Sequence, residues 1–178
     1  MNTSNTSKLK LLVYSGLMAA LVVVGTMAIR IPTPTKGYIH VGDSVVYLCG
    51  ILLGPLYGAV AAGLGSLLAD ILAGYVIYAP ASLIIKAMDA MIVGLIYLSL
   101  TKHKPSQSKK MIVFSLAVFS GSLVMVLGYL AFESILYGFP VAVLGVIPNI
   151  TQGVTGGLLL APILFLLEKQ NLLDKLVK

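Results

Sequence analysis

Charged residues are scarce in this chain. Asp, Glu, Lys and Arg make up 10% of its 178 residues, whereas a soluble domain has about 25%. Hydrophobic residues make up 58%, and the mean hydropathy is +1.01. A helix needs about 20 apolar residues to cross a bilayer, so this length accommodates about six crossings and no separate soluble domain. The composition therefore indicates an integral membrane protein.

Cysteine occurs once and tryptophan is absent. The single Cys49 excludes an intrachain disulfide and CxxC metal chemistry. Its place in an apolar run predicts an inert buried thiol. Tyrosine must supply much of any aromatic belt at the membrane surfaces.

Motifs for the common catalytic chemistries are also missing. The chain has no P-loop, no HExxH and no Ser/His/Asp set with plausible geometry. We therefore expect no enzymatic activity, no ATP hydrolysis by this chain, no metal and no cofactor. A duplicated half with paired broken helices, the usual build of secondary transporters, is absent as well.

The apolar runs predict an all-α, polytopic membrane protein with six transmembrane helices in a single domain, residues 1–178. Two helices share residues 44–74, too few for two full-length crossings, so they are short and tilted or their turn at Gly54-Pro55 is sunk in the membrane. The predicted helices cover about 9–29, the two halves of 44–74, 80–100, 111–137 and 141–168. The remaining segments are a disordered tail (1–8), an outer loop (30–42), a basic cytoplasmic loop (101–110) and a charged tail (169–178).

The net charge of +6 comes from lysines that mark one side of the membrane. With both termini cytoplasmic, only Arg30 and Lys36 lie outside. The lysines that then lie inside are Lys8, Lys10, Lys102, Lys104, Lys109, Lys110, Lys169, Lys175 and Lys178. This distribution is a topology signal, and we expect no nucleic-acid partner.

Five strongly polar residues interrupt the later apolar runs at similar depth. In the predicted orientation they fall in the outer half of the membrane, where polar groups normally face a protein interior and mark a site. These residues are Lys86, Asp89, Glu133, Asn149 and Gln152. The convergence predicts a pocket open to the outside, with a lid formed by the first loop and the Tyr75–Tyr78 loop. Tyr78 and Tyr129 are expected to stack on a flat ring, and His40 to close the lid.

Structural roles remain open for each of these groups. Lys86 and Asp89 are also compatible with a buried ion pair, Glu133 with an interfacial acid, and Asn149 and Gln152 with bonds between helices. Asp70 is expected to cap or brace a loop. His40 and Asp43 are equally compatible with loop capping, with Asp43 as a helix N-cap.

The first predicted helix carries a face of small residues, Ser15, Gly16, Ala19 and Ala20. Small residues let helices approach closely in lipid. The face is compatible with internal packing and with docking of another membrane subunit, for which Gly16, Ala19 and Ala20 are the candidates.

Several segments together resemble one family of membrane proteins. The segments are HVGD, LLGPLYGA, LADILAGY, APASLIIKAMDA, AFESILYG and IPNITQG, and they extend over most of the chain. They resemble the substrate-binding S components of energy-coupling factor (ECF) vitamin transporters, in the branch with riboflavin-type and hydroxymethylpyrimidine/pyridoxine-type members. The resemblance implies a six-helix protein that captures a vitamin from outside and works with a membrane T component and two cytoplasmic ATPases. It also implies docking through an AxxxA-like pattern in the first helix, which Gly16, Ala19 and Ala20 match loosely because position 23 is Val.

The residues and the resemblance together predict a vitamin-capture subunit in the bacterial plasma membrane. Its substrate is a small aromatic vitamin or precursor, with pyridoxine or hydroxymethylpyrimidine first and the larger riboflavin second. A proton-coupled carrier using Glu133 or Asp89 is the alternative from another class. The lack of a nucleophile–base pair or a metal cluster disfavours an intramembrane enzyme.

Overall fold

The computed structural model describes residues 3–103 and 105–170, and most of them are helical. The helices are α1 (Thr3–Ala28), α2 (Asp43–Leu72), α3 (Ala79–Thr101), α4 (Gln107–Tyr137), the short α5 (Phe139–Ala142), the 3-10 turn η1 (Val143–Gly145) and α6 (Val146–Lys169). Within the described residues, five helical runs are long and apolar enough to cross a membrane: α1, α2, α3, α4 and the run from Phe139 to Lys169. The predicted all-α class is confirmed.

Segment 30–42, predicted as an outer loop, is more ordered than expected. It forms an antiparallel hairpin of β1 (Arg30–Pro32) and β2 (Tyr38–His40), with Ile31 opposite Ile39. The turn is closed by a hydrogen bond from the Thr33 amide to the Gly37 carbonyl, 2.9 Å long. Strands of three residues are too short to show a clear alternation of polar and apolar residues. The prolines in this segment therefore indicated only a loop.

The start of the chain also differs from the expectation. α1 begins at Thr3, so the helix includes most of the segment predicted as a disordered tail. Residues 1–2 of that segment, and residues 171–178 of the predicted C-terminal tail, lie outside the described residues.

Residues 44–74 form one element with a sharp break, where the sequence predicts two helices. Gly54 interrupts α2 with φ +79° and ψ 173°, a conformation open mainly to glycine. The chain folds back at this break. Gly58 after the break lies against Cys49 before it, so closely that a β-carbon at Gly58 would be 2.5 Å from the Cys49 carbonyl oxygen. An unbroken helix would hold residues nine apart roughly 13 Å from each other along its axis.

Glycines let α2 pack closely on its neighbours. A β-carbon at Gly50 would collide with the Ala90 carbonyl of α3, and one at Gly65 would lie 2.7 Å from the Ala19 carbonyl oxygen of α1. The main core therefore lies around α2, with fully buried Tyr47, Ile51 and other side chains of α2 and its neighbours.

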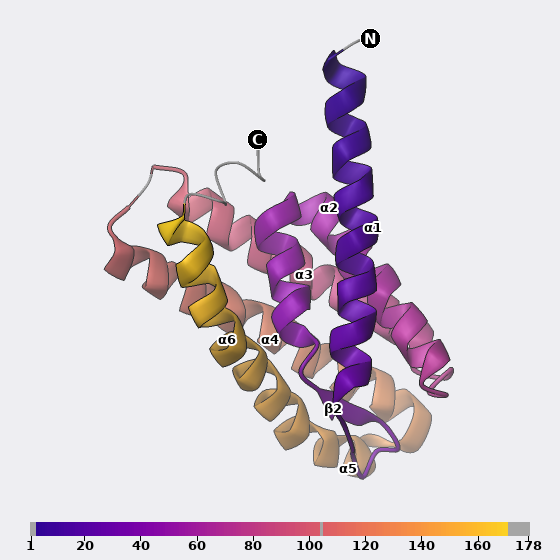
Figure 1. Ribbon diagram of the computed structural model, residues 1–178. Coiled ribbons are helices and arrows are strands. Elements are labelled where there is room, and N and C mark those ends of the chain that lie inside the picture. Colours follow the sequence, from indigo (N-terminus) through magenta and orange to yellow (C-terminus); the bar gives the residue numbers. More distant parts are fainter. Residues whose placement is uncertain (1–2, 104, 171–178) are drawn as a thin grey trace.

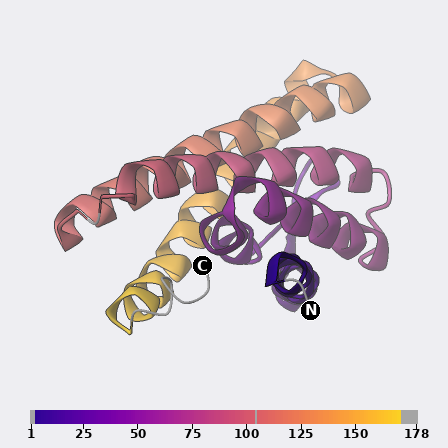
Figure 2. The ribbon, with the colours of Figure 1, turned by 90° about the horizontal axis from the view of Figure 1, so that it is seen from above.

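The helices place the hairpin at one end of the bundle. β2 and α5 lie at this end, whereas the start of α1 and the end of α6 lie toward the other (Figure 1). Figure 2 looks along α1 and shows the later helices inclined to it. The ends of α2, α3, α4 and α6 thus meet near the hairpin.

The close contact at Gly50 gives a stability prediction. Gly50→Ala should lower the free energy of unfolding by about 1–3 kcal/mol, because the added methyl group has no room beside Ala90. Gly16→Ala is the matched control: nothing lies within 4 Å of its β-carbon position, and removing a helical glycine should stabilise by up to about 1 kcal/mol. Thermal unfolding in detergent measures both, and an equal response would contradict the packing described.

Candidate ligand-binding site

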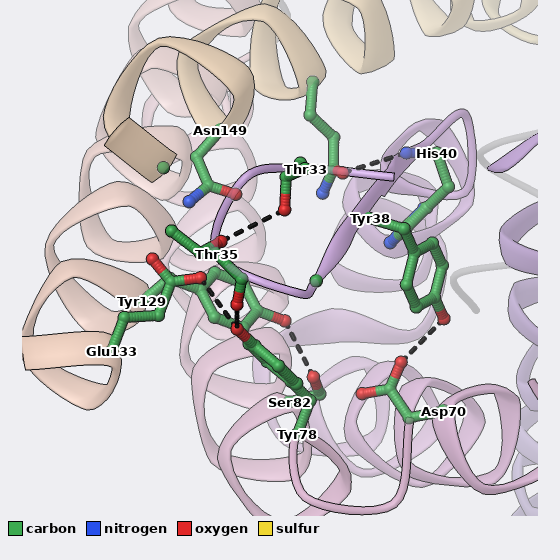
Figure 3. A pocket seen from close by; sticks show the side chains of 13 residues that line it. Thr33, Thr35, Tyr38, His40, Asp70, Tyr78, Ser82, Tyr129, Glu133 and Asn149 are labelled. Carbon is green, nitrogen blue, oxygen red and sulfur yellow. Dashed lines mark hydrogen bonds between the residues drawn. The ribbon is translucent and has the colours of Figure 1, made fainter. Parts of the chain in front are cut away.

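A small pocket lies beneath the hairpin, among side chains from five parts of the chain (Figure 3). We call residues 30–42 the lid. The lining residues are Thr33, Thr35, Gly37, Tyr38 and His40 of the lid, Asp70 of α2, Tyr78 and Ser82 at the start of α3, Tyr129 and Glu133 of α4, Gly145, and Asn149 and Gln152 of α6. The site combines aromatic rings with hydrogen-bonding groups, the usual design of a small-molecule site.

Three hydrogen bonds hold the lid to the helices. The Tyr38 hydroxyl donates to Asp70 Oδ1 (2.6 Å), and the Tyr78 hydroxyl donates to the Thr35 carbonyl (2.5 Å). The His40 amide donates to Gln152 Oε1 (2.9 Å). The bond to Tyr38 confirms that Asp70 braces a loop.

The pocket is nearly closed in this conformation. Its cavity volume is about 30 Å³, enough for roughly two water molecules. Sites for drug-sized ligands measure about 300–1,000 Å³. A molecule of vitamin size therefore fits only when the lid moves away from the helices.

Six of the eight predicted binding residues meet in this pocket. They are His40, Tyr78, Tyr129, Glu133, Asn149 and Gln152. In Figure 3 no dashed line joins Asn149 to the other lining side chains. Their role in ligand binding stays a prediction, but the proximity that it requires is present.

The other two predicted residues, Lys86 and Asp89, do not line the pocket. The Lys86 ammonium lies 2.5 Å from Asp43 Oδ1 and 2.7 Å from the sulfur of Met125. Lys86 and Asp43 are both fully buried. Neither oxygen of the buried Asp89 has a hydrogen-bond partner within the described part of the chain, so the ion pair considered between Lys86 and Asp89 is not formed here.

The expectation that Asp43 is a helix N-cap is wrong. Gly42 occupies the N-cap position, and Asp43 is the first residue of α2. Its side chain points to Lys86, because a buried ammonium needs a nearby counter-charge.

The ion pair is connected to the lid through Gln152. The Gln152 amide donates from Nε2 to Asp43 Oδ2 (3.0 Å) and accepts the His40 amide at Oε1. Asp43 thereby fixes which end of the Gln152 amide faces the lid. Lys86 is thus connected to the pocket through these two residues, and its Nζ also lies 5.8 Å from the centre of the Tyr129 ring in the lining.

His40 lies at the junction of lid and helices. Its Nδ1 accepts a hydrogen bond from the Gly42 amide (3.1 Å). Burial, opposed by the charge of Asp43 and aided by that of Lys86, lowers the pKa of the His40 imidazole from 6.5 to about 4. The ring is therefore neutral near pH 7.

The sequence predicted the first loop as a lid, but of its residues it assigned a binding role only to His40. Thr33, Thr35, Gly37 and Tyr38 line the pocket, and Thr35 is fully buried. The one available signal is the alternation in Tyr38-Ile39-His40, which places Tyr38 and His40 on the same side of a strand.

Comparison with known proteins identifies the fold. A solved structure described as "Structure and mechanism of the S component of a bacterial ECF transporter" superposes with a TM-score of 0.64 over 96% of this chain and 99% of that chain, at 19% sequence identity. The architecture is therefore that of an ECF S component.

The sequence comparisons extend this result. The family model "ECF-type riboflavin transporter, S component" matches residues 6–169, and the chain belongs to this family. A protein of Pyrococcus woesei, described as "Uncharacterized protein in gap 3'region", is 36% identical over 150 residues, which are 84% of this chain and 95% of the relative. The protein is thus a membrane-embedded transport subunit of the vitamin-capture type, not an enzyme, which confirms the resemblance seen in the sequence.

The buried ion pair yields a prediction on stability. Lys86→Met should lower the free energy of unfolding by about 3–5 kcal/mol, because it leaves the Asp43 carboxylate buried without its counter-charge. The double variant Lys86→Met/Asp43→Asn should recover most of that loss. Chemical or thermal unfolding in detergent provides the measurement.

The control is Lys110→Met, at a pair with Glu168 that is partly exposed (3.3 Å). This control variant should lower the free energy of unfolding by about 1 kcal/mol or less. Equal losses for Lys86→Met and for the double variant would show that Asp43 is not the group that Lys86 neutralises.

Proposed function

We propose that this chain is the substrate-capture subunit of an ATP-driven importer in the plasma membrane. It takes up a compact heteroaromatic vitamin or vitamin precursor from outside the cell. The observation that carries the proposal is the pocket itself, where Tyr78, Tyr129, Glu133 and Asn149 converge under a lid held by three hydrogen bonds.

The size and polarity of the site favour a small substrate. Two tyrosines flank a pocket with carboxylate, amide and hydroxyl groups, which suits a single ring with polar substituents. Pyridoxine and hydroxymethylpyrimidine have this character. Riboflavin is the second candidate, because the description of the matching family names it.

The proposed topology has six crossings and cytoplasmic termini. The turn at Gly54 supports it, since the fold-back there lets the two parts of α2 cross separately. The lid then lies outside, and the lysine-rich segment before α4 lies inside.

We further propose that a membrane T component and two cytoplasmic ATPases energise uptake, with α1 as the docking surface. Gly16 and Ala20 are exposed and lie one turn apart, which leaves a smooth strip on the helix. Ala19 is half-buried, and its carbonyl faces Gly65 of α2. Small exposed residues of this kind support close helix contact in lipid.

Binding to the purified protein tests the capture function. Isothermal titration should detect binding of pyridoxine, hydroxymethylpyrimidine or riboflavin. Asn149→Ala should then weaken binding roughly fivefold, the loss of about one hydrogen bond. Ile150→Ala, at the exposed neighbouring position, should leave affinity unchanged. Absence of binding by all three compounds would contradict the proposal.

Copurification tests the docking surface. Ala20→Leu should reduce recovery of the T component and ATPases several-fold, because the larger side chain keeps the helices apart. The matched control is Ala131→Leu on an exposed position of α4. Equal recovery with both variants would place the docking surface elsewhere.

A further inference from the structure

Two buried carboxylate oxygens in the pocket have no hydrogen-bond partner among the residues that the structure describes. They are Glu133 Oε2 and Asp70 Oδ2, on side chains that are 3% and 5% exposed. Buried polar atoms are almost always paired in native proteins, so each exception calls for a reason. Both carboxylates belong to the pocket lining.

The surroundings of Glu133 supply few hydrogen-bond donors to its carboxylate. Its Oε1 lies 3.1 Å from the Tyr78 hydroxyl, but that single proton is shared with the nearer Thr35 carbonyl. Its Oε2 faces Gly145, where a β-carbon would lie 2.5 Å away. A glycine at this position leaves room for the carboxylate and has no side chain that could donate to it.

Only one of the two carboxylate oxygens of Asp70 has a hydrogen-bond partner among the described residues. Its Oδ1 accepts the Tyr38 hydroxyl of the lid, and its Oδ2 accepts nothing from the described residues. In the view of Figure 3, Asp70 and Glu133 lie at opposite ends of the labelled group, with Tyr129, Tyr78 and Ser82 between them. The two free oxygens thus come from different helices, α2 and α4.

The lining supplies no positive charge to compensate. None of its thirteen residues is lysine or arginine, and His40 is neutral near pH 7. Lys86 is engaged by Asp43 outside the lining. Leaving a buried acceptor unmatched is costly, and the cost is greater for a charged group. A ligand that brings donors removes this cost.

We propose that the substrate presents two hydrogen-bond donors to Glu133 and Asp70, at least one of them an amino or protonated nitrogen group. Charge-assisted hydrogen bonds of this kind are short and strong. The same two carboxylates repel substrates that carry a carboxylate or a phosphate. The inference rests on the proposed function and narrows its substrate class to cationic or amino-substituted heteroaromatic molecules.

A ligand series on one ring tests the inference with the unmodified protein. Pyridoxamine carries an ammonium group at neutral pH, pyridoxine a neutral hydroxymethyl group, and 4-pyridoxate a carboxylate at the same ring position. Affinity measured by titration should fall in that order, with at least a hundredfold difference between the first and the last.

Isosteric substitutions test the two acids. Glu133→Gln and Asp70→Asn should each reduce the pyridoxamine-to-pyridoxate affinity ratio at least tenfold. Glu168→Gln is the matched control, because Glu168 is paired with Lys110 and lies outside the lining. Thermal unfolding checks each variant, and the series on the unmodified protein remains decisive if one of them does not fold.

The outcomes separate this inference from the proposed function. Equal binding of pyridoxamine and 4-pyridoxate, or a ratio that neither substitution changes, overturns the role of the carboxylates. Binding of riboflavin alone, with no member of the series bound, overturns the inference and leaves the capture function in place. Failure of the series, hydroxymethylpyrimidine and riboflavin together overturns both.

Discussion

A buried ion pair between Lys86 and Asp43 is the contact on which the site depends. Two opposite charges that leave water must stay close, because each alone is costly in a low-dielectric interior. The pair joins α3 to the first residue of α2, and Asp43 in turn orients Gln152, which receives the lid. A charge requirement within the helices thereby determines where the lid closes.

The positions of the helices could be predicted from the sequence, because they depend on local features. Apolar runs, Pro80 in the first turn of α3 and Gly138 after α4 mark the ends within a few residues. The outcome at Gly54 could be predicted only in part. The Gly-Pro pair signals a turn, but how sharply the chain folds back depends on the contact between Gly58 and Cys49, which no local pattern reveals.

The position of the site residues along their helices could be predicted from the sequence, but the direction in which their side chains point could not. Position along a helix fixes how far Glu133, Asn149 and Gln152 lie from one end of the bundle, and these residues do meet. Which way a side chain faces depends on how each helix is rotated in the bundle. Asp89 is close to Lys86 in sequence, yet the partner is Asp43, 43 residues away. The first loop was predicted as a lid, but Thr35 was not predicted as one of its anchors, because the anchoring group is a backbone carbonyl, which sequence does not distinguish.

The closed lid has a consequence for the speed of capture. Because the cavity holds only roughly two water molecules, an incoming ligand cannot enter while the hydrogen bonds of Tyr38 and Thr35 keep the lid closed. Under the proposed function, association is limited by how often the hairpin lifts and is slower than the diffusional limit. The same motion governs departure, so a bound molecule is retained for as long as the hairpin stays down.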